Sequence, residues 1–366
     1  MKIGVPREIK PDENRVALTP AGAAALVADG HEVLIEHSAG AGSGFADADY
    51  EPAGARIVAA ETAWNAELVL KVKEPTAAEY SALTGQLLFT YLHLAGVDPA
   101  LTEALLASRT TAIAYETVED NAGRLPLLAP MSAVAGAMAV AMGNFHLARS
   151  GGGRGMLLGR IFDRSFGDVL VVGDGVAGSH AARAAAGLGA KVCVVGLESN
   201  RLPELQRFIG TDFRFIHSAP ETLAGEIRNA DLVIGAVLLH GARAPHVISE
   251  AMVKTMQRGA VIVDISIDQG GCVATSRPTT HHDPVFEKHG VIHYCVTNMP
   301  GAYPRLSTLA LTEATLPYVR RLAARGLDAL REDPGFGKGL NTLDGRIACR
   351  PVAEALGRLD RYAPLA

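Results

Sequence analysis

The chain has 366 residues, of which 48% are hydrophobic and 20% are charged. This length and balance indicate a globular protein of two domains with an ample apolar core. The formal net charge of −5 and the aromatic fraction of 5% argue against a surface for nucleic acid or an anionic membrane.

The N-terminus lacks the pattern of a signal peptide, and no apolar stretch is long enough to cross a bilayer. The four cysteines show no C-x-x-C spacing, which is typical of reduced thiols in the cytosol. We therefore expect a cytoplasmic protein. The cysteines are Cys193, Cys272, Cys295 and Cys349.

The first 129 residues alternate between strand and helix patterns, as in an α/β unit. Thr19 and Pro20 are typical of a helix start and predict a helix over residues 21–29. A glycine-rich turn at 40–44 has G-x-G-x-G spacing and is followed by Asp47 and Asp49, which would repel a phosphate. Strands are predicted at 2–6, 32–36, 68–73, 87–94 and 111–115.

Residues 130–149 are predicted to form one long helix that leads into a second domain. Six apolar strands then alternate with helices, which is the doubly wound pattern of a Rossmann-like fold. These strands are expected at 169–172, 191–195, 213–216, 232–236, 261–265 and 291–296.

After residue 299 only helical segments are predicted, at 307–325, 326–332 and 352–359. Such a tail is expected to return to the first domain. We therefore predict a discontinuous substrate domain of residues 1–129 and 300–366, and a dinucleotide-binding domain of residues 130–299. The active site is expected in a cleft between these two Rossmann-like domains.

The clearest motif follows the strand at 169–172, where Gly173, Gly175 and Gly178 form G-x-G-x-x-G before a helix. The glycines permit a tight turn, close approach of a pyrophosphate and close packing of the helix. The helix is predicted at 179–188, and its free N–H groups would face the phosphates. Val176 and Ala177, inside the motif, are expected to contact the cofactor as well. The pattern predicts a dinucleotide site, and the alternative is a βα turn that binds nothing.

Two side chains at predicted strand ends are candidates for chemistry, because ligands of α/β sheets bind beyond those ends. Lys73 suits a carboxylate-binding cation, and the alternative is a solvated lysine paired with Glu74. His93 ends a nearly apolar strand, where it is either a core histidine or an acid/base that faces the substrate.

Polar residues follow other strands as well. Arg15 has the planar fork that grips a carboxylate, but a surface arginine paired with Glu13 is the simpler interpretation from position alone. Asp264 and Asp268 follow one strand of the second domain and Asn298 follows another, where a nicotinamide would lie.

A metal site is not expected. The histidines and cysteines of the second domain fit no zinc spacing. They are Cys272, His281, His282, His289, His293 and Cys295.

Taken together, the motifs identify the chain as resembling the alanine dehydrogenase/pyridine nucleotide transhydrogenase family over nearly its whole length. The resemblance is nearest to the bacterial alanine dehydrogenases. It is carried by the ordered stretches at 4–8, 14–20, 71–75, 90–95, 115–118, 127–132, 263–271 and 298–300.

The resemblance implies reversible oxidative deamination of L-alanine to pyruvate and ammonia, with hydride transfer to a nicotinamide cofactor. It implies that Arg15 and Lys73 hold the substrate, that His93 is the general acid/base, and that Asp268 orients water or ammonia. It also implies a homohexamer. Three residues would line the substrate and the nicotinamide: Met131, Ser132 and Asn298.

The choice between NAD and NADP stays open, with a slight preference for NADP. NAD-specific relatives carry an acid at the position of Gly196, which bonds the ribose 2′-hydroxyl. Its absence, with Ser199 and Arg201 beyond it, would suit a 2′-phosphate, whereas Glu198 would favour NAD if it turned back to the ribose.

Two further departures leave alternatives open. Alanine dehydrogenases usually have an acid at Ala133 and an arginine at Ala137, and they usually have Val and Pro at Leu239 and His240. A family member that acts on another small amino or oxo acid therefore remains an alternative. A second alternative is a transhydrogenase-like nucleotide-binding component without a membrane segment.

Overall fold

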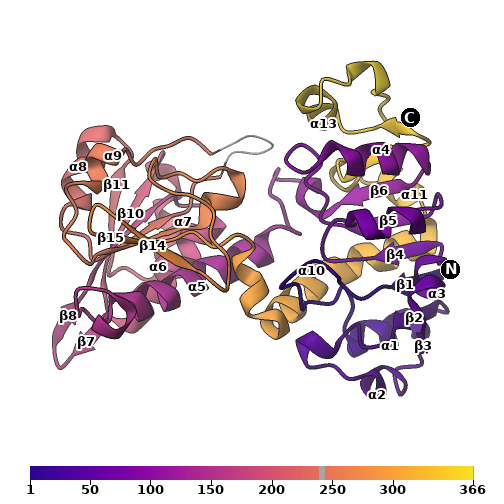
Figure 1. Cartoon of the computed structure of the whole chain (residues 1–366), viewed down its shortest axis with the longest axis horizontal. Helices are drawn as coiled ribbons and strands as arrows, with labels where there is room; N and C mark the ends of the chain where they lie inside the picture. Colours follow the sequence, from indigo (N-terminus) through magenta and orange to yellow (C-terminus); the bar gives the residue numbers. More distant parts are fainter. Residues whose placement is uncertain (239–243, 366) are drawn as a thin grey trace. The chain divides into compact units, whose positions relative to one another are not determined.

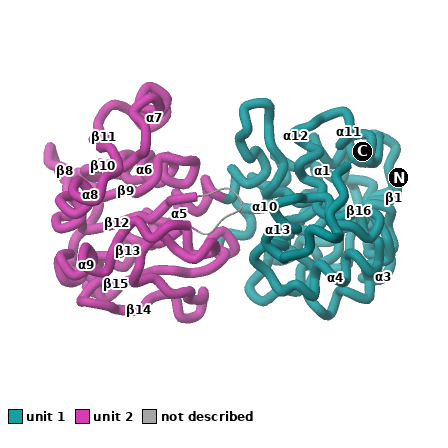
Figure 2. The backbone as a smooth tube through the Cα atoms, turned by 90° about the horizontal axis from the view of Figure 1, so that it is seen from above, with its two compact units in different colours: residues 1–131, 303–366 teal, residues 132–302 magenta. Residues whose placement is uncertain are grey.

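The computed structural model describes residues 1–238 and 244–365. The chain divides into two compact units (Figure 2). Unit 1 comprises Met1–Met131 and Tyr303–Ala366, and unit 2 comprises Ser132–Ala302. Helix α5, which spans Ala129–Leu147, begins in unit 1 and continues into unit 2. The position predicted for this connecting helix is thus correct to within two residues.

Unit 1 contains an eight-stranded sheet in the order β17-β16-β6-β5-β4-β1-β2-β3 (Figure 1). The six strands from β3 to β6 are parallel, and β16 and β17 extend the edge in antiparallel fashion. The central strands are apolar and buried, as expected for a sheet covered on both faces. The strands are β1 Lys2–Val5, β2 Glu32–Glu36, β3 Arg56–Val58, β4 Leu68–Leu70, β5 Leu87–Thr90, β6 Thr111–Ala114, β16 Leu340–Leu343 and β17 Arg346–Ile347.

The helices of unit 1 come from both of its chain segments. As predicted, Thr19 caps α1, and its hydroxyl accepts the N–H of Gly22 at 3.1 Å. The long helix α10 belongs to the second segment. The helices are α1 Pro20–Ala28, α2 Asp47–Tyr50, α3 Ala60–Trp64, α4 Pro99–Ala107, α10 Pro304–Arg325, α11 Asp328–Arg331, α12 Pro334–Gly337 and α13 Arg350–Ala355.

Unit 2 contains a seven-stranded sheet in the order β11-β10-β9-β12-β13-β15-β14. Its first six strands are parallel and follow the 3-2-1-4-5-6 order of a dinucleotide-binding fold, whereas β14 is antiparallel. A short hairpin, β7–β8, extends from the rest of the unit (Figure 1). The strands are β7 Gly159–Ile161, β8 Arg164–Phe166, β9 Asp168–Val172, β10 Lys191–Gly196, β11 Arg214–His217, β12 Leu232–Gly235, β13 Val261–Asp264, β14 Val285–Lys288 and β15 Val291–Tyr294.

Alanine-rich helices pack closely on this sheet. A Cβ atom on Gly136 of α5 would lie 2.2 Å from the carbonyl oxygen of Ala177, so the glycine is needed where α5 meets α6. The other helices of unit 2 are α6 Val176–Leu188, α7 Leu202–Ile209, α8 Pro220–Ile227 and α9 Glu250–Val253. The predicted α/β class with two doubly wound, largely parallel sheets is confirmed.

Several predicted boundaries are wrong. The tail after residue 299 was expected to be helical only, but β16 and β17 lie within it, because β16 pairs with β6 far away in the sequence. Strand β5 ends at Thr90 rather than residue 94, since the N–H groups of Leu92 and His93 bond to the carboxylate of Glu116 instead of a strand. Strands β3, β7, β8 and β14 were not predicted.

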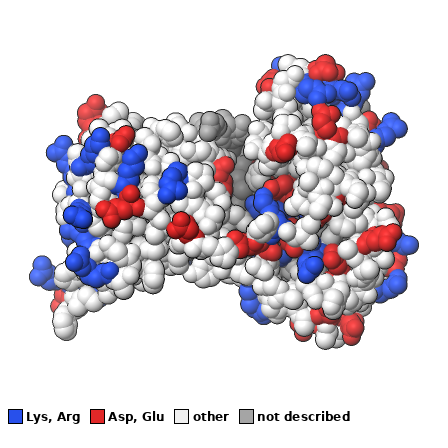
Figure 3. Space-filling view, viewed as in Figure 1, with Lys and Arg blue, Asp and Glu red and all other residues white. Residues whose placement is uncertain are grey.

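Charged side chains of both signs are scattered over each unit on the face drawn in Figure 3. Within the described residues, no helix combines the length and apolar character needed to span a membrane.

Candidate active site

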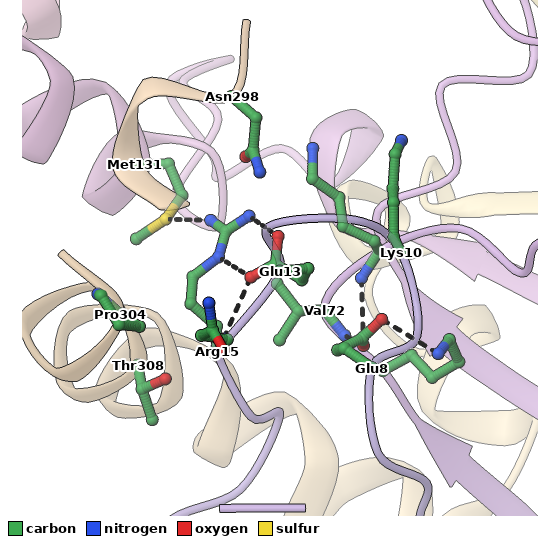
Figure 4. Close-up of polar contacts among 12 residues, drawn as sticks. Glu8, Lys10, Glu13, Arg15, Val72, Met131, Asn298, Pro304 and Thr308 are labelled. Atoms are coloured by element: carbon green, nitrogen blue, oxygen red, sulfur yellow. Dashed lines mark hydrogen bonds and ion pairs between the residues drawn. The ribbon is translucent and has the colours of Figure 1, made fainter. Parts of the chain in front are cut away.

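Arg15 lies in the loop after β1, and its side chain is only 2% exposed. Its Nε and Nη2 donate to the two carboxylate oxygens of Glu13 at 2.6 and 2.5 Å, and its Nη1 donates to the sulfur of Met131 at 3.0 Å (Figure 4). The predicted pairing with Glu13 is confirmed, but the prediction that such a pair lies at the surface is wrong. A buried guanidinium held on one side by a carboxylate presents its remaining edge in a defined direction.

The charges around Glu13 support each other. Burial would raise the pKa of Glu13, but hydrogen bonds and the charge of Arg15, together with the charge of Lys73, lower it to about 2. The carboxylate is therefore ionised at neutral pH and compensates the buried arginine. Arg15 and Lys73 are cations and Glu13 is an anion, so these three side chains together carry a net positive charge.

Lys73 follows β4 and is partly buried. Its predicted alternative partner, Glu74, forms an ion pair with Lys10. The backbone that carries Lys73 is held by Glu8, whose carboxylate accepts the N–H groups of Val72 at 2.6 Å and of Lys73 at 3.3 Å (Figure 4). The position of Lys73 thus depends on a neighbouring loop.

Glu8 has a second task, which sequence reasoning missed. Its other oxygen pairs with the buried ammonium of Lys71 at 3.0 Å, and Glu79 pairs with the same ammonium at 2.9 Å. Burial raises the pKa of Glu8, and the charge of Lys71 opposes that rise. Lys71 is therefore a structural cation, in contrast to Lys73 two residues later.

His93 is not a core residue, because its side chain is 43% exposed. Its backbone is left-handed, with φ of 49°, and its ring stacks on that of Tyr91 with centroids 5.7 Å apart. Glu116 accepts the backbone N–H of His93 at 2.6 Å, and the same oxygen lies 3.8 Å from Nδ1. The ring is thus supported on one face by Tyr91 and has the carboxylate of Glu116 near its Nδ1 atom.

Glu116 was not singled out as a partner of His93 from the sequence. The signal lies in the strand register, since Thr90 of β5 pairs with Ala114 of β6. His93 and Glu116 follow these paired positions by three and two residues. Parallel neighbours therefore deliver both side chains to the same edge of the sheet.

In unit 2, Asp268 and Asn298 come together as their positions predicted. Asp268 lies in the 3-10 helix η6 (Ile265–Gln269), and its carboxylate accepts the backbone N–H of Asn298 at 3.1 Å. Asn298 has a left-handed backbone with φ of 55°. Asp268 is exposed, so its carboxylate is accessible to a ligand.

Asp264 is structural rather than a second site residue. It is fully buried, and its carboxylate accepts the N–H groups of Ser266, Cys272 and Val273 at 3.0 to 3.2 Å. A Cβ on Gly271 would lie 2.9 Å from Asp264 Oδ2, so this glycine serves the loop that wraps around the carboxylate. Burial raises the pKa of Asp264.

The glycine loop between β9 and α6 has the geometry of a phosphate cradle. Gly173 has φ of 109°, and a Cβ on Gly178 would lie 1.8 Å from the carbonyl oxygen of Gly173. In contrast, a Cβ on Gly175 would meet no atom within 4 Å. The loop is closed where α6 packs and open at its middle glycine, where the N-terminal N–H groups of α6 begin. These features fit a dinucleotide.

Beyond β10, three predicted cofactor residues lie in or next to the 3-10 helix η5 (Ser199–Arg201). Glu198 and Ser199 are exposed, and the carboxylate of Glu198 accepts a hydrogen bond from the side chain of Asn200 at 2.6 Å. Arg201 donates through Nη1 to the backbone oxygen of Asp174 at 2.5 Å, in the glycine loop.

Most positions at which this sequence departs from the usual alanine dehydrogenase pattern lie within the described residues. Ser132 and Ala133 are partly buried on α5, and Ala137 is exposed on the same helix. An arginine at position 137 would therefore lie at the surface of the unit. Leu239 and His240 lie outside the described residues.

All four cysteines are free thiols. Within residues 1–238 and 244–365, no three His, Cys, Asp or Glu side chains are grouped so that they could hold a metal ion. His293 is buried and bonds Thr275 at 2.7 Å, and burial lowers its pKa to about 4.

Comparisons with known proteins show the family of the chain. The family model for the N-terminal domain of alanine dehydrogenase/PNT matches residues 4–135, and the model for the C-terminal domain matches residues 139–350. The chain belongs to the alanine dehydrogenase/pyridine nucleotide transhydrogenase family. The resemblance inferred from the motifs is thus confirmed.

Individual family members are similar over almost the entire chain. The alanine dehydrogenase of Mycolicibacterium smegmatis is 52% identical over 360 residues, which is 97% of each chain. That of Bacillus subtilis is 50% identical over 362 residues, covering 98% of this chain and 95% of the relative.

Two solved structures superpose on nearly the whole chain. An L-alanine dehydrogenase superposes with a TM-score of 0.93 at 48% identity, covering 98% of this chain and 99% of the other. A transhydrogenase from Sinorhizobium meliloti superposes with a TM-score of 0.81 at 24% identity, covering 96% and 99%, and shares the fold.

Proposed function

We propose that the protein is an NAD(P)-dependent L-alanine dehydrogenase, which converts L-alanine reversibly to pyruvate and ammonia. One observation carries the proposal: identity of about 50% to alanine dehydrogenases extends over nearly the full chain. In agreement with it, Arg15, Lys73, His93 and Asp268 all lie at strand ends or in the loops that follow them. In this proposal unit 1 binds the substrate and unit 2 binds the dinucleotide.

Arg15 and Lys73 bind the substrate carboxylate and oxo group. Nη1 of Arg15 donates to the sulfur of Met131, which is a weak acceptor. A substrate carboxylate would take the place of this sulfur and form a stronger, charge-assisted hydrogen bond. Glu13 keeps the guanidinium oriented during this exchange. Met131 and Asn298 complete the substrate contacts.

His93 is the general acid/base. In the oxidative direction a bound dinucleotide would supply the hydride acceptor for the substrate Cα. Loss of the hydride and of one amine proton leaves an iminium carbon, and His93 takes a proton from the water that adds there. His93 then returns a proton to the departing amine, while the new hydroxyl group loses its proton to become the keto group of pyruvate. Glu116 and Tyr91 hold the ring in position. Asp268 orients the attacking water, or ammonia in the reverse direction.

The dinucleotide is held by the glycine loop of unit 2. Its pyrophosphate would be held at Gly175 by the N–H groups at the start of α6, including those of Val176, Ala177 and Gly178. Ser132, Asp268 and Asn298 contact the nicotinamide half. Glu198, Ser199 and Arg201 lie beyond β10, toward the adenosine half, in this proposal.

Initial rates with L-alanine at high pH, measured separately with NAD+ and NADP+, test the function. Because general acid/base groups contribute about 10²- to 10⁴-fold, His93→Ala should lower kcat by that factor. His37→Ala is the matched control, since His37 is also in unit 1 and is 77% exposed. Turnover should persist in that control.

The same assay separates the alternatives. Absence of alanine turnover in protein that binds a dinucleotide would contradict the proposal, and rates with other small amino and oxo acids would identify a related dehydrogenase. Hydride exchange between two dinucleotides without any amino acid would instead favour a transhydrogenase-like component.

The proposal includes self-association of the protein. We expect a homo-oligomer, and the family resemblance implies that it is a hexamer. The β7–β8 hairpin carries Phe162, which is 95% exposed, and Ile161, which is 49% exposed. Such apolar side chains at the tip of a hairpin suit burial against another copy. Phe162→Ser should lower the mass measured by light scattering, whereas an unchanged mass would contradict a role of the hairpin.

The four free thiols support a cytoplasmic location.

A further inference from the structure

Gly196 ends β10 at the position where NAD-specific relatives carry a ribose-binding acid. In this chain the space for such a side chain is taken. A Cβ on Gly196 would lie 2.7 Å from Cζ of Phe215 and 3.0 Å from the carboxyl carbon of Asp174. An acid at position 196 would therefore collide with the Phe215 ring, and a different carboxyl group already lies beside this position.

That carboxyl group comes from the glycine loop itself, because Asp174 stands between Gly173 and Gly175. Val172 of β9 pairs with Val195 of β10, so the residues that follow these two strands are neighbours at the same sheet edge. The side chain of Asp174 is 17% exposed and so retains access to solvent. The neighbouring strand thus supplies an acid at the place where β10 has none.

We propose that Asp174 binds the hydroxyl groups of the adenosine ribose and makes the protein select NAD over NADP. This inference rests on the dinucleotide site of the proposed function. An ionised carboxylate accepts hydrogen bonds at both oxygens, which suits a ribose with free hydroxyls. A 2′-phosphate would bring further negative charge to the same carboxylate, which is unfavourable.

Arg201 takes the role of orienting Asp174 rather than of receiving a 2′-phosphate. Its Nη1 lies 3.5 Å from Asp174 Oδ2 and bonds the backbone oxygen of the same residue, and its Nε lies 3.7 Å from Glu204. Two carboxylates, those of Asp174 and Glu204, therefore lie near this one guanidinium. This balance opposes the slight preference for NADP that the sequence alone suggested.

Binding of dinucleotides to the full chain, measured by calorimetry, tests the inference without using activity. The wild-type protein should bind NAD+ about a hundredfold more tightly than NADP+. Because a hydrogen bond to a charged group is lost, Asp174→Ala should weaken NAD+ binding by about tenfold to a hundredfold and leave NADP+ binding equal or tighter. Asp212→Ala is the matched control, an exposed acid just before β11 in unit 2, and should change neither affinity.

The 2′-deoxy analogue of NAD+ identifies the contact. In wild-type protein it should bind more weakly than NAD+, whereas in Asp174→Ala the two should bind alike, since hydroxyl and carboxylate are partners. Asp174→Asn, which keeps the shape and one acceptor, should shift the NAD+ to NADP+ ratio in the same direction and guards against a folding defect in Asp174→Ala.

Tighter binding of NADP+ to wild type, or an unchanged NAD+ to NADP+ ratio in both Asp174 variants, would overturn the inference even if alanine is turned over. Conversely, a protein that prefers NAD+ through Asp174 but does not oxidise alanine would support the inference while contradicting the proposed function. The two proposals therefore fail separately.

Discussion

The two units have similar parallel sheets but different glycine-rich turns. In unit 2 the space beside Gly175 is open, and α6 begins there. In unit 1 the turn at 40–44 is closed, because a Cβ on Gly42 would lie 2.8 Å from the carbonyl oxygen of Asn14. Arg305 also donates to the carbonyl of Gly44 at 2.9 Å. Glycine content alone therefore does not make a phosphate site, since the space beside the middle glycine must also be open.

The edges of the two sheets differ in a second way. Unit 1 gathers charged side chains after its strands, and Glu13, Arg15 and Lys73 are the main examples. Unit 2 offers backbone N–H groups at the start of a long helix. Side-chain charges suit a small, charged amino acid, whereas a row of backbone donors suits the phosphates that all dinucleotides share.

The largest effect is expected from filling the open turn. Gly175→Val places a branched side chain where the pyrophosphate would lie and should weaken NAD+ binding about a thousandfold, which is about 4 kcal/mol. The fold should persist, because Gly175 has extended backbone and no atom within 4 Å of its Cβ direction. Calorimetry and circular dichroism check the two parts. Gly187→Val, at another open glycine of α6, is the control and should bind normally.

Acid should act mainly on the charged edge of unit 1. The pKa of Glu13 is lowered from 4.5 to about 2 in the folded chain. Its ionised form therefore stabilises the fold above pH 4.5, and this contribution, about 3 kcal/mol, is lost as the pH falls from 4.5 to 2. Glu13→Gln should flatten the pH dependence of the melting temperature in that window. Glu61→Gln, at an exposed acid, should keep the wild-type slope.

A substitution in the closed turn of unit 1 should lower stability and leave NAD+ binding unchanged, which is the reverse of the effect expected at the open turn. Gly42→Ala forces a methyl group against the backbone of Asn14 and should lower the free energy of unfolding by about 2 kcal/mol. NAD+ affinity should not change. A Gly42→Ala protein with wild-type stability, measured by denaturant titration of the unit 1 transition, would show that the turn is not closed by packing.

A smaller effect is expected at the support of the acid/base residue. Glu116→Gln keeps an oxygen for the N–H groups of Leu92 and His93 but removes the charge near Nδ1. We expect kcat for alanine oxidation to fall about tenfold, or about 1.4 kcal/mol in the barrier, with NAD+ affinity unchanged. Equal losses in kcat and in NAD+ affinity would instead indicate a general defect of the protein.

Features built from adjacent residues were predictable. The strand, glycine turn and helix at 168–188 form one continuous stretch, and Thr19 caps a helix that begins at the next residue. Features that need two distant segments were missed. Strand β16 is four residues long and exists because β6 offers it an edge, which no local pattern reveals.

The sequence by itself determined the α/β class, the dinucleotide loop, the family and the candidate residues Arg15, Lys73, His93 and Asp268, because each is written in a local pattern or motif. The tertiary structure decided which side chains are partners. Glu116 reaches His93, and Asp174 lies beside Gly196, through the register of neighbouring strands. That register depends on how distant segments pack, so contacts across it cannot be read from either segment alone.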